Sequence, residues 1–383
     1  MTDQTKKRHI STQLVHAGER QGPPPGQPVA TPIYATATFT YDSMQEIDQV
    51  FSGEKAGYIY TRYGNPTIGA LEDAMREIED GATACAYATG MAAVHAALIA
   101  SDLKAGSTVL ASQDLYGATT SLLQTVFTSF GVKTVTADFS DLGTVREKAR
   151  EIRPQVVVAE TISNPLLKIC DVKATAEIAH EHGGRLIIDN TFASPFLCQP
   201  LKLGADMVVH SATKYLGGHA DTMGGIVVSR DEMDRPALFS VMKLVGGVLG
   251  VWDAHEILRG LKTLAVRMER QCDNARKLAS QLSENPRIGR VHYPALGALV
   301  SIELRDNTRD AAFRFMDALQ LCVRSTSLGD VFTSVLHPAT ASHRDVIPAR
   351  RQELGIVDGL VRISVGIESI DDIIADIEQA LAA

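Results

Sequence analysis

The stretch that decides the fold is "MVVHSATKYLGGHAD", residues 207–221. Its first four residues suit a buried strand, and the chain then passes two hydroxyl side chains, Ser211 and Thr213, before it reaches Lys214 and a pair of glycines. The pattern therefore predicts a lysine at the tip of a core strand. Taken alone, a lysine in a glycine-rich loop is more often a solvated surface residue. Whether Lys214 is functional therefore depends on which residues lie at the ends of the other strands.

The composition argues against several classes of function. The 383 residues are 45% hydrophobic and 21% charged, which is typical of a soluble globular protein. A net charge of -8 argues against nucleic acid or an anionic membrane as partner, because both require a basic surface. No apolar run reaches the length of a membrane span, and the first residues lack the hydrophobic region of a secretory signal. We expect a cytoplasmic protein whose partner is a small molecule.

Cysteine and histidine usage indicates a reduced protein without a metal site. The five cysteines are scattered, odd in number and free of any CxxC pair, which is typical of thiols in a reducing compartment. His210 and His219 have a spacing that matches no usual ligand pair, so we expect both to be structural.

The chain divides into three parts by its patterns. Residues 1–60 show little periodicity and include the proline-rich segment "GPPPGQP", so we expect an extended arm that contacts a neighbouring subunit. Residues 61–250 alternate helical stretches with short β-branched runs. Residues 251–383 begin with a long helical pattern and continue with alternating strand-like runs and helices, which predicts a smaller C-terminal α+β domain.

Short runs in the larger domain predict an α/β fold. They are apolar on both faces and are separated by amphipathic segments, which indicates a mainly parallel sheet between helices. In such sheets a ligand binds beyond the carboxyl ends of the strands. The runs cover residues 109–113, 133–139, 155–161, 185–191, 207–213 and 224–230.

Three chain segments at these strand ends carry complementary chemistry. Asp189 closes the run "LIID", Lys214 follows "VVHSAT", and "ATGMAA" places Gly90 at the start of a helix. A helix start with small residues offers free backbone N–H groups to a phosphate, and Ser211 and Thr213 can add hydroxyl donors. A lysine can bind an aldehyde covalently, and an aspartate can keep a ring nitrogen protonated. Asp189 alone is more often a cap or turn residue, but the combination meets the requirements of pyridoxal 5'-phosphate (PLP).

Segments spread over nearly the whole chain resemble the Cys/Met-metabolism (trans-sulfuration) family of PLP enzymes. This family includes cystathionine γ-lyase, methionine γ-lyase, cystathionine γ-synthase and the O-acylhomoserine sulfhydrylases. The resemblance implies the PLP-dependent transferase fold type I with a seven-stranded sheet, residues 61–250 as the PLP-binding domain, and a homotetramer built as a dimer of dimers. The matching segments are "YTRYGNPT", "ATGMAA", "DLYGAT", "ETISNP", "IIDNTFASP", "HSATKYLGGHAD", "LRGLKTL", "SLGD" and "LVRISVG".

The resemblance also implies a role for each matching residue. Lys214 would bind the cofactor covalently and carry protons, Asp189 would pair with the pyridine nitrogen, and Tyr116 would stack on the ring and act as the acid near the leaving group. The other implied cofactor contacts are the backbone of Gly90 and Met91, the hydroxyls of Ser211 and Thr213, Asn164 beside the ring hydroxyl, and Tyr60 and Arg62 from the neighbouring subunit.

The implied substrate contacts are Arg362 on the carboxylate, helped by Ser327 and Tyr60. Arg362 suits this task because a guanidinium binds a carboxylate with two prongs. Without the resemblance, Arg362, Tyr60 and Arg62 are more typical of surface residues, and Tyr116 is as typical of simple packing.

The resemblance implies α,γ-elimination on a sulfur amino acid to give 2-oxobutanoate, ammonia and a thiol. A γ-replacement enzyme, a cystathionine γ-synthase or an O-acylhomoserine sulfhydrylase, is the alternative, and a noncatalytic PLP-binding protein is a third hypothesis. Thr326 stands before "SLG" where enzymes of cystathionine often have an acidic residue, and Ala118 stands where methionine γ-lyases often have a cysteine. The segment "SLGD" and the C-terminal tail are more similar to methionine γ-lyases, whereas "GNPT" is more similar to the cystathionine enzymes.

One departure from the family concerns the chain after Pro294. Family members usually have a loop with a proline, histidines and a glycine-rich turn at this point, but here Pro294 runs directly into "ALGALVSIEL". The connection is therefore short either through a natural deletion or because residues are absent from the sequence, and in the family this region lies near the substrate entrance.

Overall fold

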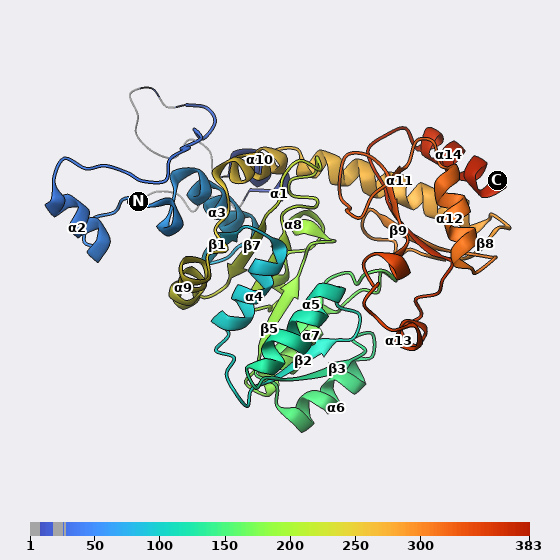
Figure 1. Ribbon diagram of the computed structural model, residues 1–383, viewed down its shortest axis with the longest axis horizontal. Helices are drawn as coiled ribbons and strands as arrows, with labels where there is room; N and C mark the ends of the chain where they lie inside the picture. Colours follow the sequence, from blue (N-terminus) through green and yellow to red (C-terminus); the bar gives the residue numbers. More distant parts are fainter. Residues whose placement is uncertain (1–7, 18–25, 27) are drawn as a thin grey trace.

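The computed structural model describes residues 8–17, 26 and 28–383. Most of the proline-rich segment, residues 22–28, lies outside the described residues. A central sheet runs through the middle and lower part of Figure 1, and a smaller C-terminal sheet lies at the right. Among the described residues, no helix combines the length and the apolar character needed to cross a bilayer.

The central sheet has seven strands in the order β1-β7-β6-β5-β4-β2-β3. Neighbouring strands from β6 to β3 are parallel, whereas β7 is antiparallel to both β6 and β1. The predicted mainly parallel seven-stranded sheet is therefore confirmed. The strands are β1 (Thr83–Tyr87), β2 (Thr108–Ser112), β3 (Lys133–Ala137), β4 (Val156–Glu160), β5 (Arg185–Asp189), β6 (Met207–Ser211) and β7 (Gly225–Ser229).

Six of these strands match the predicted runs, and β1 was missed. Its sequence, "TACAY", has Thr83 as its single β-branched residue and contains no Val or Ile, so it lacks the apolar β-branched run that identifies a strand. It is nevertheless buried at every position, because it pairs with β7 and packs against α3 (Pro66–Glu79). Tertiary pairing, rather than local propensity, makes it a strand.

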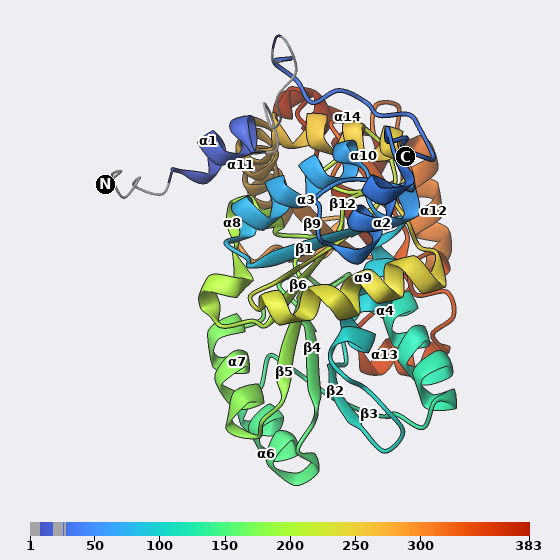
Figure 2. The ribbon, with the colours of Figure 1, turned by 90° about the vertical axis from the view of Figure 1, so that its left-hand side faces the viewer.

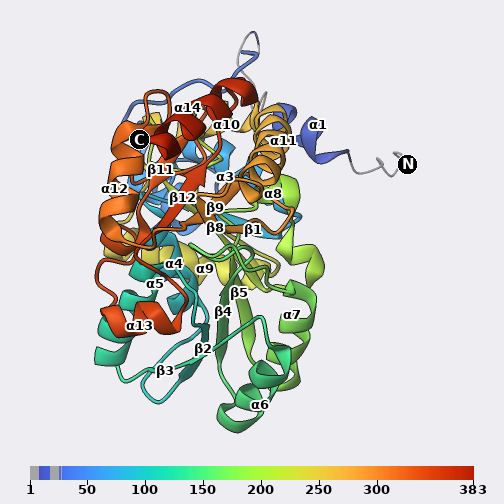
Figure 3. The same ribbon diagram turned by 90° about the vertical axis from the view of Figure 1, so that its right-hand side faces the viewer.

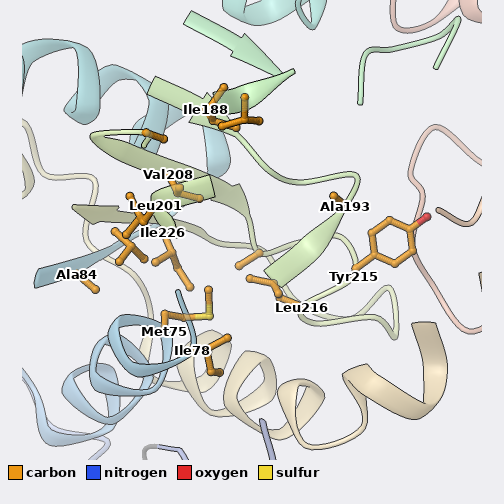
Figure 4. Close-up of a cluster of buried hydrophobic side chains, with 14 of the residues drawn as sticks. Met75, Ile78, Ala84, Ile188, Ala193, Leu201, Val208, Tyr215, Leu216 and Ile226 are labelled. Atoms are coloured by element: carbon orange, nitrogen blue, oxygen red, sulfur yellow. The ribbon is translucent and has the colours of Figure 1, made fainter. Parts of the chain in front are cut away.

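Helices cover both faces of the central sheet. One face packs against α4 (Gly90–Ala100) and α9 (Arg235–Val245), through a buried cluster that includes Val94 and Leu238. The other face packs against α3 (Pro66–Glu79), α6 (Leu142–Ile152) and α7 (Val172–Glu181). Figure 2 shows α7 and α4 on opposite sides of β4 and β5, and Figure 4 shows Met75 and Ile78 of α3 against side chains of the sheet.

The C-terminal sheet has five strands in the order β10-β11-β12-β9-β8. Its helices α11, α12 and α14 bury a separate apolar cluster against it. Figure 3 shows these helices beside the sheet. The elements are β8 (Ile288–His292), β9 (Leu299–Leu304), β10 (Val323–Arg324), β11 (Ser334–Leu336), β12 (Leu360–Ser364), α11 (Leu264–Ser283), α12 (Arg309–Ala318), α13 (Pro348–Glu353) and α14 (Ile370–Ala382).

The long helical pattern over residues 253–285 is two helices rather than one. Helix α10 (Val251–Leu261) ends before α11, where the N–H groups of Lys262 and Thr263 bond to carbonyls three residues earlier. Gly260 lies just before this break and lowers the local helix propensity. A Cβ at Gly260 would collide with the carbonyls of Leu216 and Gly217, so the glycine lets α10 pack directly on the segment that follows Lys214.

The described part of the predicted arm contains two helices, α1 (Ile10–His16) and α2 (Met44–Ser52). Leu14 of α1 is buried in the main cluster, whereas α2 has no buried residue and stands away from the rest of the chain in Figure 1. The contact of this arm with a neighbouring subunit, and the domain boundaries at residues 60 and 250, stay predictions.

Short elements complete the chain. They are η1 (Thr61–Tyr63), α5 (Gly117–Ser121), the π-helix η2 (Leu122–Phe127), α8 (Ser194–Leu197), η3 (Pro200–Leu203), η4 (Glu232–Asp234) and η5 (Pro338–Thr340). Residues 293–298 join β8 directly to β9 in a tight connection in which Ala295 and Gly297 have positive φ angles. The connection expected to be short is therefore a compact turn.

Candidate active site

The carboxyl ends of β4, β5 and β6 open into a cavity of about 470 Å³. Its wall is completed by the start of α4, by the segment before α5 and by residues of the C-terminal sheet and its loops. Another cavity, of about 800 Å³, lies between α2, α3 and α9, but it contains neither Lys214 nor Asp189. The chemistry predicted from the sequence therefore belongs to the first cavity.

Most of the predicted site residues line this cavity. Ser327 borders it through hydrogen bonds, whereas Tyr60 and Arg62 do not line the cavity of their own chain. The lining residues that the sequence predicted are Gly90, Met91, Tyr116, Asn164, Asp189, Ser211, Thr213, Lys214 and Arg362.

The start of α4 is suited to hold a phosphate. The hydroxyl of the N-cap residue Thr89 accepts the N–H of Ala92 at 3.0 Å, so the first N–H groups of the helix, at Gly90 and Met91, remain as donors. A Cβ on Gly90 would lie 2.9 Å from the Ser211 hydroxyl oxygen, closer than real side chains approach. Glycine therefore leaves room for an anion between the helix start and Ser211, which fits the phosphate of PLP.

Lys214 lies in the turn after β6, and its amine faces the C-terminal domain. Nζ donates a hydrogen bond to the hydroxyl of Ser327 at 3.1 Å. Burial lowers the pKa of Lys214, and the positive charge of Arg362 lowers it further, while Asp330 acts in the opposite sense. A lysine with a lowered pKa is neutral more often and is a better nucleophile toward an aldehyde.

Asp189 ends β5 and has no ion-pair partner among the described residues. Its carboxylate accepts the N–H of Thr191 at 2.9 Å, and burial raises its pKa. A buried anion requires a cation or several donors to be stable. The protonated pyridine nitrogen of PLP would supply that partner.

Tyr116 is the residue before α5, and its side chain is 42% exposed. Its backbone N–H donates to Oε1 of Glu160 at 2.6 Å. The next residue, Gly117, lies against the backbone of Ser342, because a Cβ there would be 2.7 Å from the Ser342 carbonyl oxygen. The backbone of Tyr116 is thus held from two sides while its ring faces the cavity.

Arg362 is 3% exposed in the middle of β12. One terminal nitrogen donates to Oδ1 of Asn164 at 2.8 Å and the other to the carbonyl of Ser327 at 3.2 Å. Nε has no hydrogen-bond acceptor among the described residues, and burial lowers the pKa of the guanidinium to about 10. A substrate carboxylate would therefore meet a desolvated cation with an unused donor.

Tyr60 and Arg62 lie at η1, outside the cavity of their own chain. Arg62 donates to the carbonyl of Lys243 at 2.9 Å and its guanidinium lies 4.8 Å from the centre of the Tyr63 ring, while Tyr60 is 40% exposed. Their contact with the phosphate of a neighbouring subunit stays a prediction.

His210 and His219, which the sequence predicted to be structural, each have a hydrogen-bond partner within the protein. His210 is buried and its Nε2 lies 2.6 Å from Oε1 of Glu79, while Nδ1 of His219 lies 2.7 Å from the carbonyl of Gly217. Within the described ranges, no group of His, Cys, Asp and Glu side chains could hold a metal ion.

Sequence reasoning missed several lining residues. Glu160 and Thr191 lie at the ends of predicted strand runs, so their position at the carboxyl edge was an available signal. Phe192 follows directly, and Met223 precedes β7. Ala341 and Ser342 lie in a loop whose sequence carries no recognisable motif, and only the folded chain brings this loop to the cavity.

Comparisons with known proteins agree with this geometry. Residues 11–382 match the family model described as "Cys/Met metabolism PLP-dependent enzyme". An L-methionine gamma-lyase of Fusobacterium nucleatum subsp. polymorphum is 41% identical over 396 aligned positions, covering 99% of both chains. A cystathionine gamma synthase of Xanthomonas oryzae pv. oryzae, solved with aminoacrylate and cysteine, has a TM-score of 0.92 at 34% identity, with 98% of each chain covered.

A third comparison includes the cofactor. A Campylobacter jejuni structure assigned as an O-acetylhomoserine (thiol)-lyase contains N'-pyridoxyl-lysine-5'-monophosphate. It matches this chain with a TM-score of 0.92 at 28% identity and covers 98% of this chain and 100% of its own.

Proposed function

The chain belongs to the Cys/Met metabolism family of PLP-dependent enzymes, and on this premise we propose that it is a carbon–sulfur lyase. The reaction is α,γ-elimination on methionine, homocysteine or cystathionine, which consumes water and yields 2-oxobutanoate, ammonia and a thiol. The observation that carries the proposal is that Lys214, Asp189, Tyr116 and Arg362 line one cavity. The full-length similarity to an L-methionine gamma-lyase supports the choice of reaction.

Different residues of the cavity are assigned to different parts of the cofactor. When bound, PLP supplies an electron sink for negative charge at the substrate α carbon. Gly90, Met91, Ser211 and Thr213 would hold its phosphate, and Asp189 would pair with its pyridine nitrogen. Tyr116 would lie against its ring, Asn164 would lie beside its ring hydroxyl, and Lys214 would attach it covalently.

The remaining steps are binding and proton transfer by the chain itself. Arg362 binds the substrate carboxylate, with Ser327 beside it. Nζ of Lys214, once released, removes a proton from the α carbon and then one from the β carbon. The phenol of Tyr116 donates a proton to the departing sulfur, so that the leaving group is a neutral thiol.

We propose that the protein is a cytoplasmic homotetramer, a dimer of dimers in which the arm of residues 1–60 lies on a neighbouring subunit. Support comes from α2, where Met44 and Phe51 are 76% and 60% exposed, and from Tyr60 and Arg62, which lie outside their own cavity. In a partner's cavity, Tyr60 and Arg62 would reach the cofactor phosphate, and Tyr60 also the substrate. The unpaired state of all five cysteines is compatible with a reducing compartment.

A γ-replacement enzyme is the second candidate. The similarity to a cystathionine gamma synthase favours it, since the same proton transfers can be followed by capture of an incoming thiol. A noncatalytic PLP-binding protein is disfavoured because the complete set of reactive residues lines the cavity.

The deciding experiment is a visible absorption spectrum of the purified protein before and after methionine, homocysteine, cystathionine and O-acetylhomoserine are added, with an assay for 2-oxobutanoate. Under the lyase proposal, the band of the lysine-bound cofactor shifts and 2-oxobutanoate forms from a sulfur substrate without an added thiol. Thioether formation only when a thiol is supplied would identify the replacement enzyme, and a band that no amino acid changes would identify a binding protein.

A further inference from the structure

Glu160 is a buried carboxyl group in the active site that the proposed reaction does not use. It is the last residue of β4, it is 8% exposed and it lines the cavity. None of the ion pairs among the described residues includes it, whereas the neighbouring acidic group Asp114 pairs with Lys168 at 2.9 Å. An uncompensated acidic group at this position requires an explanation, because burial of a free carboxylate is costly.

The sheet places Glu160 directly beside Asp189. The two residues are register partners at the ends of the parallel strands β4 and β5. Register partners on neighbouring strands point to the same face, and the strands lie about 4.8 Å apart. The two carboxyl groups therefore belong to one site and affect each other's ionisation.

We expect one of these two carboxyl groups to be protonated and the other to be an anion. Burial raises the pKa of Glu160 well above its ordinary value, and the charge of Asp189 raises it further, while the backbone N–H groups of Tyr116 and Asn164 act in the opposite sense without cancelling the rise. Burial also raises the pKa of Asp189, but Thr191 donates to that carboxylate and His210 favours its anion. Because the cofactor's pyridine nitrogen would add a cation next to Asp189, the anion belongs on Asp189 and the proton on Glu160.

The same carboxyl group also holds the backbone of two other site segments. Oε1 accepts the N–H of Tyr116 at 2.6 Å, and the backbone N–H of Asn164 also bonds to the carboxyl group. Glu160 thus connects the end of β4 to the residue whose ring faces the cavity. No other described side chain accepts this N–H of Tyr116, so Glu160 provides one of the two contacts that hold the tyrosine, beside the packing of Gly117 against Ser342.

We propose that Glu160 is a positioning residue that acts as a neutral carboxylic acid: it leaves Asp189 as the only anion at this edge of the cofactor site and fixes Tyr116 over the cavity. The proposal rests on the proposed function, because Asp189 and Tyr116 are assigned to the cofactor there. It adds a residue that holds others in place without touching the reacting atoms.

The protonation state is tested by infrared difference spectroscopy of the cofactor-bound protein at neutral pH. Glu160→Gln keeps a neutral acceptor for the Tyr116 N–H but has no acid proton. Subtracting its spectrum from the wild-type spectrum should leave the C=O band of a protonated carboxylic acid. The matched control Glu147→Gln changes an exposed carboxyl group on α6 and should leave no such band. A carboxylate band in the Glu160→Gln difference would overturn the proposal.

The positioning role is tested by the visible circular dichroism of the bound cofactor and by kinetics. Glu160→Ala removes the acceptor, so the dichroism should change at unchanged cofactor content, and kcat should fall by roughly 10- to 100-fold, more than KM changes. Glu160→Gln should keep the dichroism and lose less than about fivefold in kcat. Equal losses in both variants would contradict a neutral acid, and wild-type dichroism and kcat in Glu160→Ala would contradict the positioning of Tyr116.

Failure of this inference can be distinguished from failure of the proposed function. If the wild-type protein forms no 2-oxobutanoate from any sulfur amino acid, the assigned reaction is wrong, but the infrared and dichroism measurements still report on Glu160. If Glu160→Ala does not fold, the Glu160→Gln difference spectrum alone decides the protonation state, and its kcat against wild type decides whether a neutral acceptor suffices.

Discussion

The cofactor side and the substrate side of the cavity are built in different ways. On the cofactor side, Asp189 and Glu160 lie at the ends of adjacent strands, and Gly90 opens a helix. On the substrate side, Arg362 comes from the second sheet and is held by Asn164, 198 residues away in sequence. The first side is fixed by the register of one sheet, whereas the second depends on how two sheets and their loops meet.

This difference indicates where the chain can vary. Groups fixed by strand register cannot move without disturbing a buried sheet, so the cofactor side is suited to chemistry common to a whole family. Loops such as residues 337–347 connect elements without forming part of the sheet core. The substrate side is therefore where specificity can change at small cost to the fold, and Thr326, Ala341 and Ser342 are the positions in contact with it.

The largest expected effect is on the cofactor side. Lys214→Ala removes the amine that attaches the cofactor and moves protons, so formation of 2-oxobutanoate should fall by at least about 10⁴-fold. The control Lys202→Ala changes an exposed lysine and should retain activity. Measurable turnover by Lys214→Ala close to that of the control would remove the basis of the proposed function.

A smaller effect is expected on the substrate side from Arg362→Lys. The ammonium group cannot replace two separate hydrogen bonds, to Asn164 and to the Ser327 carbonyl, and still bind a carboxylate with two prongs. We expect kcat/KM to fall about 100-fold, mainly through KM, while the cofactor spectrum stays unchanged. Arg314→Lys on the exposed face of α12 is the control. A changed cofactor spectrum in Arg362→Lys would mean that the two sides are not separable.

Sequence reasoning succeeded on the cofactor side because the signals there are local. A β-branched run followed by Asp189, or by Ser211, Thr213 and Lys214, specifies both the strand and the groups at its end. The strand β1 was missed because it has no apolar β-branched run, and it becomes a strand through pairing with β7. The division of one long helical pattern into α10 and α11 was missed because it depends on the packing of Gly260 against a distant loop.

The residues of the substrate side could be predicted only from the family resemblance. Nothing in the sequence around Arg362 indicates that its partner is Asn164. The place of Ser327 at the substrate carboxylate stays a prediction; its hydroxyl accepts a hydrogen bond from Lys214 and its carbonyl accepts one from Arg362. These contacts join residues 35, 113 and 198 positions apart, and short-range patterns carry no information on them.

We expect acid to lower the stability of the folded protein through His343, on the substrate side of the cavity. This residue is 3% exposed in the loop that borders the cavity, and burial lowers its pKa to about 4, with the charges of Arg362 and Arg351 adding to the effect. Because the folded chain resists protonation, the stability that His343 contributes is present above its ordinary pKa of 6.5 and is lost as the pH falls toward 4.

Between pH 7 and about pH 5, the loss from His343 should amount to about 2 kcal/mol in the free energy of unfolding. Urea unfolding at several pH values measures it, and His343→Gln should flatten the slope, whereas His255→Gln on α10 should leave it in place. The same slope in His343→Gln as in wild type would assign the acid sensitivity to another group.

The smallest effect returns to the cofactor side and concerns Gly90. In Gly90→Ala the new Cβ would lie 2.8 Å from the Cβ of Ser211, so the hydroxyl that faces the phosphate must shift. We expect about a 10-fold loss of affinity for PLP, measured by reconstitution of the apoprotein, with little change in KM for substrate. Gly289→Ala on β8 is the control, since its Cβ would meet nothing closer than 3.4 Å. If Gly90→Ala raised KM as much as it weakened cofactor binding, the phosphate site would be coupled to the substrate side. The cofactor side, which strand register fixes, and the substrate side, which depends on loops, would then act as one unit.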